Sequence, residues 1–435
     1  MDESIVPESV VFQEAPMELP EVLQEPTSSK HPLFLVLYGV ANMVIGIGNI
    51  TLATVLLPRQ IASMVSGNQT GTFALIVGLG AVAAVLTNPL VGMLSDRTTS
   101  RFGRRRSWLV AGGVLTVVAV LLLSIASSLL LVVVEWIFLE IAINLVQAAL
   151  TAILPDQVPV RQRATVSAFA AGLGTLLGGL FGQILVAQVF KEIQAAYTSI
   201  AVTIVIMLAL FLLVLREVPL SREHVPPFRI KHILAAYWLD PLANRDLFLT
   251  WLARCLMFLG YTTVVNFMFY YLQDAVQYVR VFPGQTTAQG VQTFFAINVG
   301  SILVASLFGG MLSDKMQRRR PFVIVASLIM TVGLLLYAFF PTWAMVIVAT
   351  VVLGLGMGIF LAVDLALASQ VLPKAADRGK DMGIINTAIF LPMILSPIIA
   401  GVTLSALHSY LALFSLLAVA TLFSAILIVP IKSVC

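Results

Sequence analysis

The chain has 435 residues, of which 59% are hydrophobic and only 11% are charged, with a formal net charge of +4. Ordinary soluble domains carry about 25% charged residues, so the composition excludes a water-soluble enzyme. Nucleic-acid binding is also excluded, because the basic residues fall in short loops between apolar runs. The two cysteines, Cys255 and Cys435, match no metal-ligand spacing, and neither a metal nor a cofactor is expected. The composition indicates a polytopic membrane protein.

The chain begins with an acidic segment and then alternates between apolar runs and polar loops. Seven acidic residues and four prolines lie within residues 1–30, which predicts a disordered tail rather than a cleaved signal peptide. Twelve apolar runs of membrane-spanning length follow, near 33–57, 72–95, 107–127, 130–154, 164–189, 197–215, 247–272, 290–313, 322–340, 343–369, 381–405 and 408–430. The predicted organisation is a tail (1–30), a six-helix half (31–215), a central loop (216–246), a second six-helix half (247–430) and a short tail (431–435).

The basic residues predict the orientation of this all-α membrane protein. With the N-terminal tail placed in the cytoplasm, 21 of the 25 lysines and arginines fall on the cytoplasmic side. Arg59, Lys191 and Arg280 fall outside, and Arg254 lies within a span. Because cytoplasmic loops carry the excess of basic residues, both termini are expected inside the cell. No organelle address is recognisable, so the plasma membrane is the expected location.

The two halves are repeats of one another. The sequence Gly92-Met-Leu-Ser-Asp96 returns as Gly310-Met-Leu-Ser-Asp314, an offset of 218 residues. Each copy closes the second span of its half and leads into a basic cluster, at 104–106 or 318–320. Duplicated six-span halves are typical of secondary transporters, whose substrate site lies near the midplane between the halves.

The loop that follows the second span resembles a known signature. The segment from Gly92 to Trp108, with its Ser-Asp-Arg and Ser-Arg-Phe-Gly-Arg-Arg-Arg sequences, resembles the signature loop of the major facilitator superfamily, and especially that of the glycoside–cation and sucrose–proton symporters. The resemblance implies a cytoplasmic gate, in which Gly92 lets two helices approach closely and arginines bridge to carboxylates. The gate residues expected across both halves are Gly92, Asp96, Arg97, Arg101, Arg104, Arg105, Asp156, Asp314, Arg318 and Asp364. Any single arginine could instead serve only to orient the chain in the membrane.

The fourth span carries a second resemblance. It contains Trp136-Ile-Phe-Leu-Glu140-Ile-Ala-Ile-Asn144-Leu-Val-Gln147 and ends at Pro155-Asp156. Sucrose–proton symporters have an acidic residue, an Asn, a Gln and an Asp at the same intervals. In that family the acidic residue is the proton-coupling carboxylate, so the resemblance implies this role for Glu140.

The spacing of the residues supports the same site independently. Trp136, Glu140, Asn144 and Gln147 follow one stripe of a helix, and Glu140 lies about 15 Å deep at 1.5 Å per residue. A carboxylate at that depth is costly when charged, which suits a proton carrier. Asn144 and Gln147 could bind sugar hydroxyls and Trp136 could stack on a pyranose ring, although the stripe could also only pack polar groups between helices.

Polar residues in other spans are further candidates for substrate binding, namely Asn42, Asn49, Arg254, Asn266 and Tyr270. Arg254 is the only basic residue within a span, and is therefore a candidate counter-charge for a carboxylate. It could equally extend its side chain to the cytoplasm.

Departures from related families narrow the prediction. Sodium-coupled glycoside symporters carry carboxylates where this chain has Asn88 and Ile143, which argues against that sodium site. Drug–proton antiporters carry a proline where this chain has Thr175. The leading prediction is a monomeric proton-coupled symporter that binds a sugar or glycoside, protons and the lipid bilayer. A drug or metabolite exporter is the alternative, and a non-transporting membrane sensor is a remote one.

Overall fold

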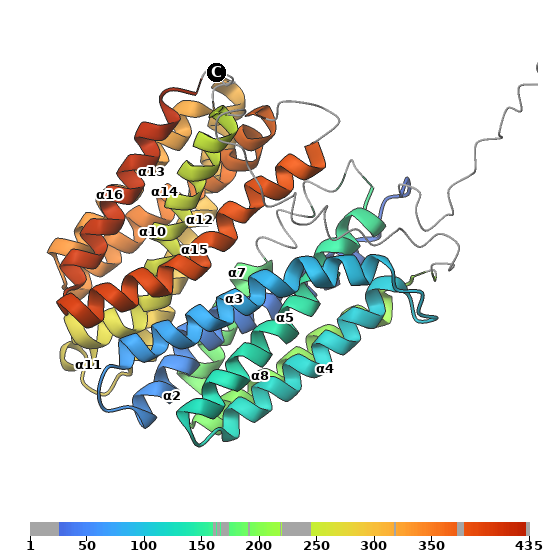
Figure 1. Cartoon of the computed structure of the whole chain (residues 1–435), viewed down its shortest axis with the longest axis horizontal. Coiled ribbons are helices and arrows are strands. Elements are labelled where there is room, and N and C mark those ends of the chain that lie inside the picture. Colours follow the sequence, from blue (N-terminus) through green and yellow to red (C-terminus); the bar gives the residue numbers. More distant parts are fainter. Residues whose placement is uncertain are drawn as a thin grey trace, which may run out of the picture.

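The computed structural model describes residues 26–159, 162, 166, 174–189, 192–217, 219, 245–316, 319–371 and 378–431. These residues form helices joined by short connections, and no strand occurs among them. Figure 1 shows two helical bundles, a blue-to-green one from the first half of the chain and a yellow-to-red one from the second. The all-helical class predicted from the apolar runs is thereby confirmed.

The N-terminal bundle begins with one continuous helical segment, Pro32–Met64, which contains α1 (Pro32–Gly46), the π-helical η2 (Ile47–Leu56) and α2 (Leu57–Met64). The other helices are α3 (Gln69–Asp96), α4 (Arg104–Ile125), α5 (Leu129–Gln157), α7 (Gly174–Ile184) with its π-helical continuation η4 (Leu185–Val189), and α8 (Ile193–Val214).

The C-terminal bundle contains α10 (Arg245–Tyr270) with its π-helical continuation η6 (Tyr271–Ala275), the short α11 (Tyr278–Val281), α12 (Thr287–Met316), α13 (Arg320–Phe339), α14 (Trp343–Val371), α15 (Arg378–Leu407) and α16 (Tyr410–Ile428). Ten helices of the described chain are long and apolar enough to cross a membrane. Shorter apolar helices at Gly174–Ala187 and Leu391–Leu407 occupy the positions predicted for spans five and eleven.

Side-chain caps define where several spans begin after the tight turns at the predicted outer end. Asn68 accepts a hydrogen bond from the Gly71 N–H (2.9 Å) at the start of α3, and Ser128 accepts one from Leu131 (3.3 Å) at the start of α5. Ser409 caps α16 in the same way. These residues satisfy backbone donors that the first helical turn leaves unpaired, so each helix starts at a defined residue.

Glycines on α7 allow the close packing that their spacing predicts. A Cβ on Gly178 would lie against the Met43 backbone of α1, and the Thr51 hydroxyl donates to the Gly179 carbonyl at 2.9 Å. Close backbone approach of this kind is how small residues hold membrane helices together. α1, η2 and α7 therefore form one tightly packed group on the side of the N-terminal bundle that meets the other half.

The three π-helical segments were not predicted from hydropathy. The 218-residue offset of the repeat places η6 in register with residues 53–57, so the widened turns of the first and seventh spans occur at related positions. π-helical turns are rare and often mark functional sites. η2 packs against α10 and α12 of the opposite half, and Gln273 of η6 contacts Gln69 of α3.

Two helix pairs make up a large part of the boundary between the bundles. α3 of the first half packs along α15 of the second, and these two helices run next to one another in Figure 1. α7 of the first half packs on α12 of the second. The candidate site residues of α5 lie behind α3, so the position of α3 affects both the site and the boundary.

Candidate functional site

Glu140 lies in the middle of α5, and its side chain is half-buried. The adjacent turn is fixed by amides, because Asn144 Nδ2 donates to the Glu140 main-chain carbonyl (2.8 Å) and Asn88 Nδ2 of α3 donates to Asn144 Oδ1 (3.2 Å). Among the described residues, the Glu140 carboxylate takes part in no ion pair. An ionised carboxylate at this depth is costly without a counter-charge, which favours a group that binds and releases a proton.

Trp136 and Glu140 both press against the same glycine of α3. A Cβ on Gly80 would lie 2.5 Å from Trp136 Nε1 and 2.9 Å from Glu140 Cγ. The Trp136 side chain is fully buried, and no hydrogen-bond acceptor faces its indole N–H in the described chain. In this conformation the ring is covered by α3 and presents no open face to a ligand.

The remaining predicted polar residues of the first half differ in exposure. Gln147 and Asn49 are half-buried, whereas Asn42 is buried with its amide donating to the Tyr38 carbonyl (2.8 Å). The Tyr38 hydroxyl in turn donates to the Leu150 carbonyl (2.9 Å), which ties α1 to α5. Gln147 and Asn49 are therefore partly exposed, whereas the Asn42 amide is bonded within α1.

The two halves meet near the first turns of α3. The ring of Phe73 lies 5.3 Å from Phe267 and 5.2 Å from Tyr270 of α10, centroid to centroid. Gln273 Nε2 lies 3.4 Å from Gln69 Oε1 at the edge of this contact. The predicted outer end of the boundary is therefore closed by buried aromatic rings.

Two predicted residues of α10 lie at or near this closure. Tyr270 is buried in it, and its hydroxyl has no partner in the described part of the chain. Asn266, one turn before, is half-buried.

Arg254 and Asp364 form an ion pair inside the second half. Arg254 Nη2 of α10 lies 3.1 Å from Asp364 Oδ2 of α14, and both side chains are less than 5% exposed. The guanidinium also lies over the Phe258 ring, 5.7 Å from its centroid. The counter-charge sought for a carboxylate is therefore used within the second half, and Glu140 does not share it.

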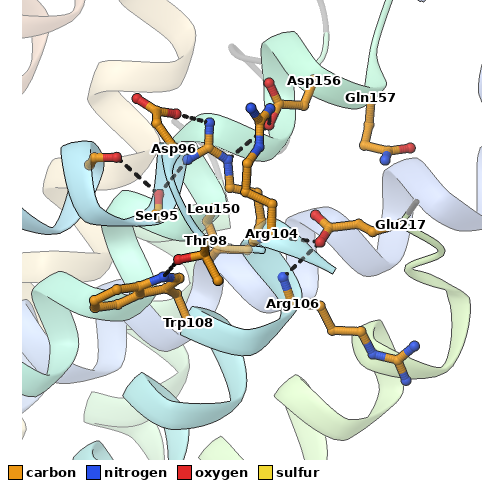
Figure 2. Close-up of polar contacts among 12 residues, drawn as sticks. Ser95, Asp96, Thr98, Arg104, Arg106, Trp108, Leu150, Asp156, Gln157 and Glu217 are labelled. Carbon is orange, nitrogen blue, oxygen red and sulfur yellow. Dashed lines mark hydrogen bonds and ion pairs between the residues drawn. The ribbon is translucent and has the colours of Figure 1, made fainter. Parts of the chain in front are cut away.

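A compact charge cluster joins α3, α4 and α5 at the end opposite the aromatic closure (Figure 2). Arg104 Nη2 and Arg105 Nε both donate to Asp156 Oδ2, at 2.7 and 2.8 Å. Arg105 also donates to Asp96 and to the Ser95 hydroxyl. We call Asp96, Arg104, Arg105 and Asp156 the cytoplasmic cluster, after the side of the membrane on which the sequence predicts them; the described partners of their side chains all belong to the first half of the chain. Charge-assisted bonds of this kind are strong and geometrically specific.

Glu217 completes this end of the bundle and was missed by sequence reasoning. Its carboxylate accepts hydrogen bonds from the Arg105 and Arg106 backbone N–H groups at 2.8 and 2.9 Å (Figure 2). Burial raises the pKa of the Glu217 carboxyl, and the two N–H donors oppose this effect. The cap comes from beyond α8 because α4 starts with Gly103 and three arginines, which supply no acceptor of their own. The lack of a capping side chain at the start of α4 is the only sequence signal that pointed to a distant acceptor such as Glu217.

Gly103 makes room for that distant cap. Its φ of 104° is a conformation that residues with a Cβ rarely adopt, and a Cβ there would lie 2.7 Å from the Glu217 Cβ. Both the backbone angle and the missing side chain are therefore required at this position.

The remaining gate residues of the prediction differ in their surroundings, and some lie outside the described residues. Nothing among the described residues lies within 4 Å of a Cβ built on Gly92, so the close helix approach expected there is absent in this conformation. Arg101 is exposed, with its guanidinium over the Phe102 ring, and Arg97 is half-buried. Arg318 lies outside the described residues, as do most of both tails and of the central loop; for Asp314 only its place in α12 is described.

A further polar contact joins the second half at mid-height. The Tyr261 hydroxyl of α10 donates to Asn298 Oδ1 of α12 at 2.8 Å, and Asn298 Nδ2 is buried without a partner in the described chain. Tyr261 belongs to no recognisable sequence motif. Only its place two turns beyond Arg254 on the same face of α10 could have indicated that it contacts another helix.

Comparison with known proteins agrees with this architecture. The family model of the Major Facilitator Superfamily matches residues 33–287 and 280–433. The chain is 22% identical over 167 residues to the general alpha-glucoside permease of Schizosaccharomyces pombe. That match covers 34% of this chain and 30% of the permease, so the chain spans about a third of this relative.

A solved structure shares the fold over almost the whole chain. The crystal structure of the nucleoside transporter NupG superimposes with a TM-score of 0.71 at 12% identity, and the match covers 92% of this chain and 99% of that one. The fold, the repeated halves and the family match describe a membrane transporter rather than an enzyme. The chain belongs to the Major Facilitator Superfamily.

Proposed function

We propose that this protein is a proton-coupled symporter of a sugar or glycoside, and that Glu140 binds the coupled proton. The observation that carries the proposal is the position of Glu140 in mid-α5, half-buried and without an ion-pair partner among the described residues. A carboxyl group in that setting gains from protonation before the carrier reorients, and it releases the proton where water reaches it.

The distribution of contacts between the halves supports alternating access. The described aromatic contacts between the halves lie at the Phe73 end of α3, whereas the cytoplasmic cluster at the Asp96 end bonds only within its own half. A carrier closed at one end and unlatched at the other exposes its centre to one side of the membrane only. The cytoplasmic cluster then acts as part of a gate that engages the second half in the opposite state.

The proposed substrate class rests on side-chain chemistry and on one relative. Gln147 and Asn49 of the first half and Asn266 of the second are half-buried amides, which both donate and accept hydrogen bonds as hydroxyl-rich ligands require. Asn144 holds the turn next to Glu140. The partial match to a glucoside permease points in the same direction.

The proposal includes a place in the cell and a topology. We place both termini and the central loop (216–246) in the cytoplasm, with 31–215 and 247–430 as the two moving halves of a monomer in the plasma membrane. The distribution of 21 basic residues on one side supports this orientation.

The test is uptake of labelled sucrose and maltose into proteoliposomes, with and without an inward proton gradient, for the wild type and Glu140→Gln. The gradient should drive accumulation by the wild type, and Glu140→Gln should lose accumulation while retaining exchange without a gradient. Glu135→Gln is the matched control, because it makes the same change on the same helix near its predicted outer end.

Each outcome separates the parts of the proposal. Full gradient-driven accumulation by Glu140→Gln would show that another group binds the proton. Absence of flux for either sugar would contradict the sugar assignment, and outward flux in a drug-resistance screen would then identify an exporter.

A further inference from the structure

Trp136 carries a buried hydrogen-bond donor that the proposed function leaves unused. The side chain is 0% exposed, and Nε1 has no acceptor among the described residues. Buried indole N–H groups normally have a partner, because an unpaired donor is unfavourable away from water. Such a group suggests that its acceptor appears in another state of the protein.

The geometry at Gly80 points to a candidate acceptor. Trp136 Nε1 lies 2.5 Å, and Glu140 Cγ 2.9 Å, from the position that a Gly80 Cβ would occupy. Trp136 and Glu140 are one helical turn apart on α5, so their side chains meet against the same point of α3. The carboxyl group attached to this Cγ is therefore a candidate acceptor for the indole N–H.

No other charged group lies at this depth on α5 or on the described stretches of α1, α3 and α4, which pack against it. Of the helices packed on α5, α1 offers only Tyr38, which donates to Leu150, and α3 offers only Asp96. α4 offers Arg104, Arg105 and Arg106 in its first turn, at the cytoplasmic end. α5 itself carries Glu135 near its start and Asp156 in its last turn, where Asp156 bonds to Arg104 and Arg105.

We propose that the Trp136 indole N–H donates a hydrogen bond to the ionised Glu140 carboxylate and thereby sets the proton affinity of the coupling site. This inference rests on the proposed function of Glu140. When Glu140 is protonated, the neutral carboxyl group is a weaker acceptor, and the indole N–H is held less strongly. When the proton leaves towards the cytoplasm, the carboxylate accepts the indole N–H in place of a full counter-charge.

Removal of the indole N–H should change the proton affinity of Glu140 in a predictable direction. A hydrogen bond to the charged form favours ionisation, so Trp136→Phe should make Glu140 hold its proton more tightly. The pH midpoint of proton-driven uptake should move upward by about one unit, which is a roughly tenfold increase in proton affinity. Trp343→Phe is the matched control, because it makes the same change in an aromatic contact with Tyr278 in the other half; its midpoint should equal that of the wild type.

A second readout does not depend on transport. In a variant that keeps Trp136 and replaces Trp108, Trp238, Trp251 and Trp343 by Phe, the Trp136 fluorescence should titrate with pH. Adding Glu140→Gln, a change of nearly equal size, should abolish that titration. This measurement decides the inference even where Trp136→Phe does not insert into membranes.

The two arms fail in different ways. A wild type without proton-driven uptake contradicts the proposed function, whereas a Trp136 titration that survives Glu140→Gln contradicts the indole–carboxylate bond. A Trp136→Phe pH profile that superimposes on that of the wild type also overturns the inference.

Discussion

The absence of a side chain at Gly80 shapes the surroundings of Glu140, the residue proposed to bind the coupled proton. Gly80 has no Cβ, and Trp136 and Glu140 fill the space that a Cβ would take. α3 can therefore approach α5 closely enough for its backbone to cover the indole ring. The position of the Glu140 stem is thus determined by a residue on another helix that carries no functional group.

Gly80→Ala tests this packing. The added methyl group would meet Trp136 Nε1 at 2.5 Å and Glu140 Cγ at 2.9 Å, so we expect a loss of about 1–3 kcal/mol in stability together with impaired uptake. Gly300→Ala is the control, because nothing lies within 4 Å of a Cβ at that exposed position of α12. Thermal unfolding in detergent and proteoliposome uptake measure the two effects. Equal unfolding midpoints and equal uptake for the two variants would show that α3 can shift away from α5 at Gly80 without cost.

At the scale of the element, α4 depends on a residue far away in sequence. The carboxylate of Glu217, which lies just after α8, accepts the first free N–H groups of α4, and Gly103 leaves the space that it occupies. The central loop therefore starts from a fixed point on the first half. The same cap holds the backbone of Arg104 and Arg105 in place, because these two residues of the cytoplasmic cluster lie in the turn that Glu217 caps.

Gly103→Ala should lower the stability of the protein by more than the backbone strain of an alanine at positive φ. Gly284→Ala provides the comparison, because Gly284 also has a positive φ, 89°, but nothing within 4 Å of its Cβ position. Each substitution strains the backbone by about 1–3 kcal/mol. Loss of the Glu217 cap should cost Gly103→Ala about 1 kcal/mol more. The measurement is the difference in midpoint of thermal unfolding, and equal midpoints would argue against the cap.

At the scale of the whole molecule, the aromatic closure should hold one end of the carrier shut. Gln69 and Gln273 face one another there, 3.4 Å apart between their amide atoms. Cysteines at both positions, in a chain with Cys255 and Cys435 replaced by Ser, should be cross-linked by a short bifunctional reagent. We expect cross-linking to stop transport, because the two halves can then no longer separate at this end.

The control pair for this cross-link lies within one half. Ser327 and Ser424 approach to 3.3 Å between hydroxyl oxygens on α13 and α16. Cysteines there should be cross-linked without arrest, since both helices move together. Transport that continues after complete cross-linking of positions 69 and 273 would contradict closure and opening at this end.

Sequence patterns predicted the parts of the molecule that depend on local chemistry. Apolar run length found the spans, and the repeated Gly92 and Gly310 segments found the two halves, because both signals are contiguous along the chain. These contiguous signals could not predict contacts between residues that are distant in sequence. The local sequence does not indicate that Arg254 pairs with Asp364 or that Glu217 caps α4, because each contact depends on how distant helices pack.

The arrangement of helices at the boundary has a consequence for the ancestry of the protein. α3, the second span, packs on α15, the eleventh, and α7, the fifth, packs on α12, the eighth. Each half thus offers its own second span to the fifth span of the other, which is the reciprocal contact of a two-fold symmetric dimer. An ancestral six-helix unit with this surface would have paired with an identical copy before gene fusion joined the two. Two separately expressed halves are therefore expected to associate through these complementary surfaces.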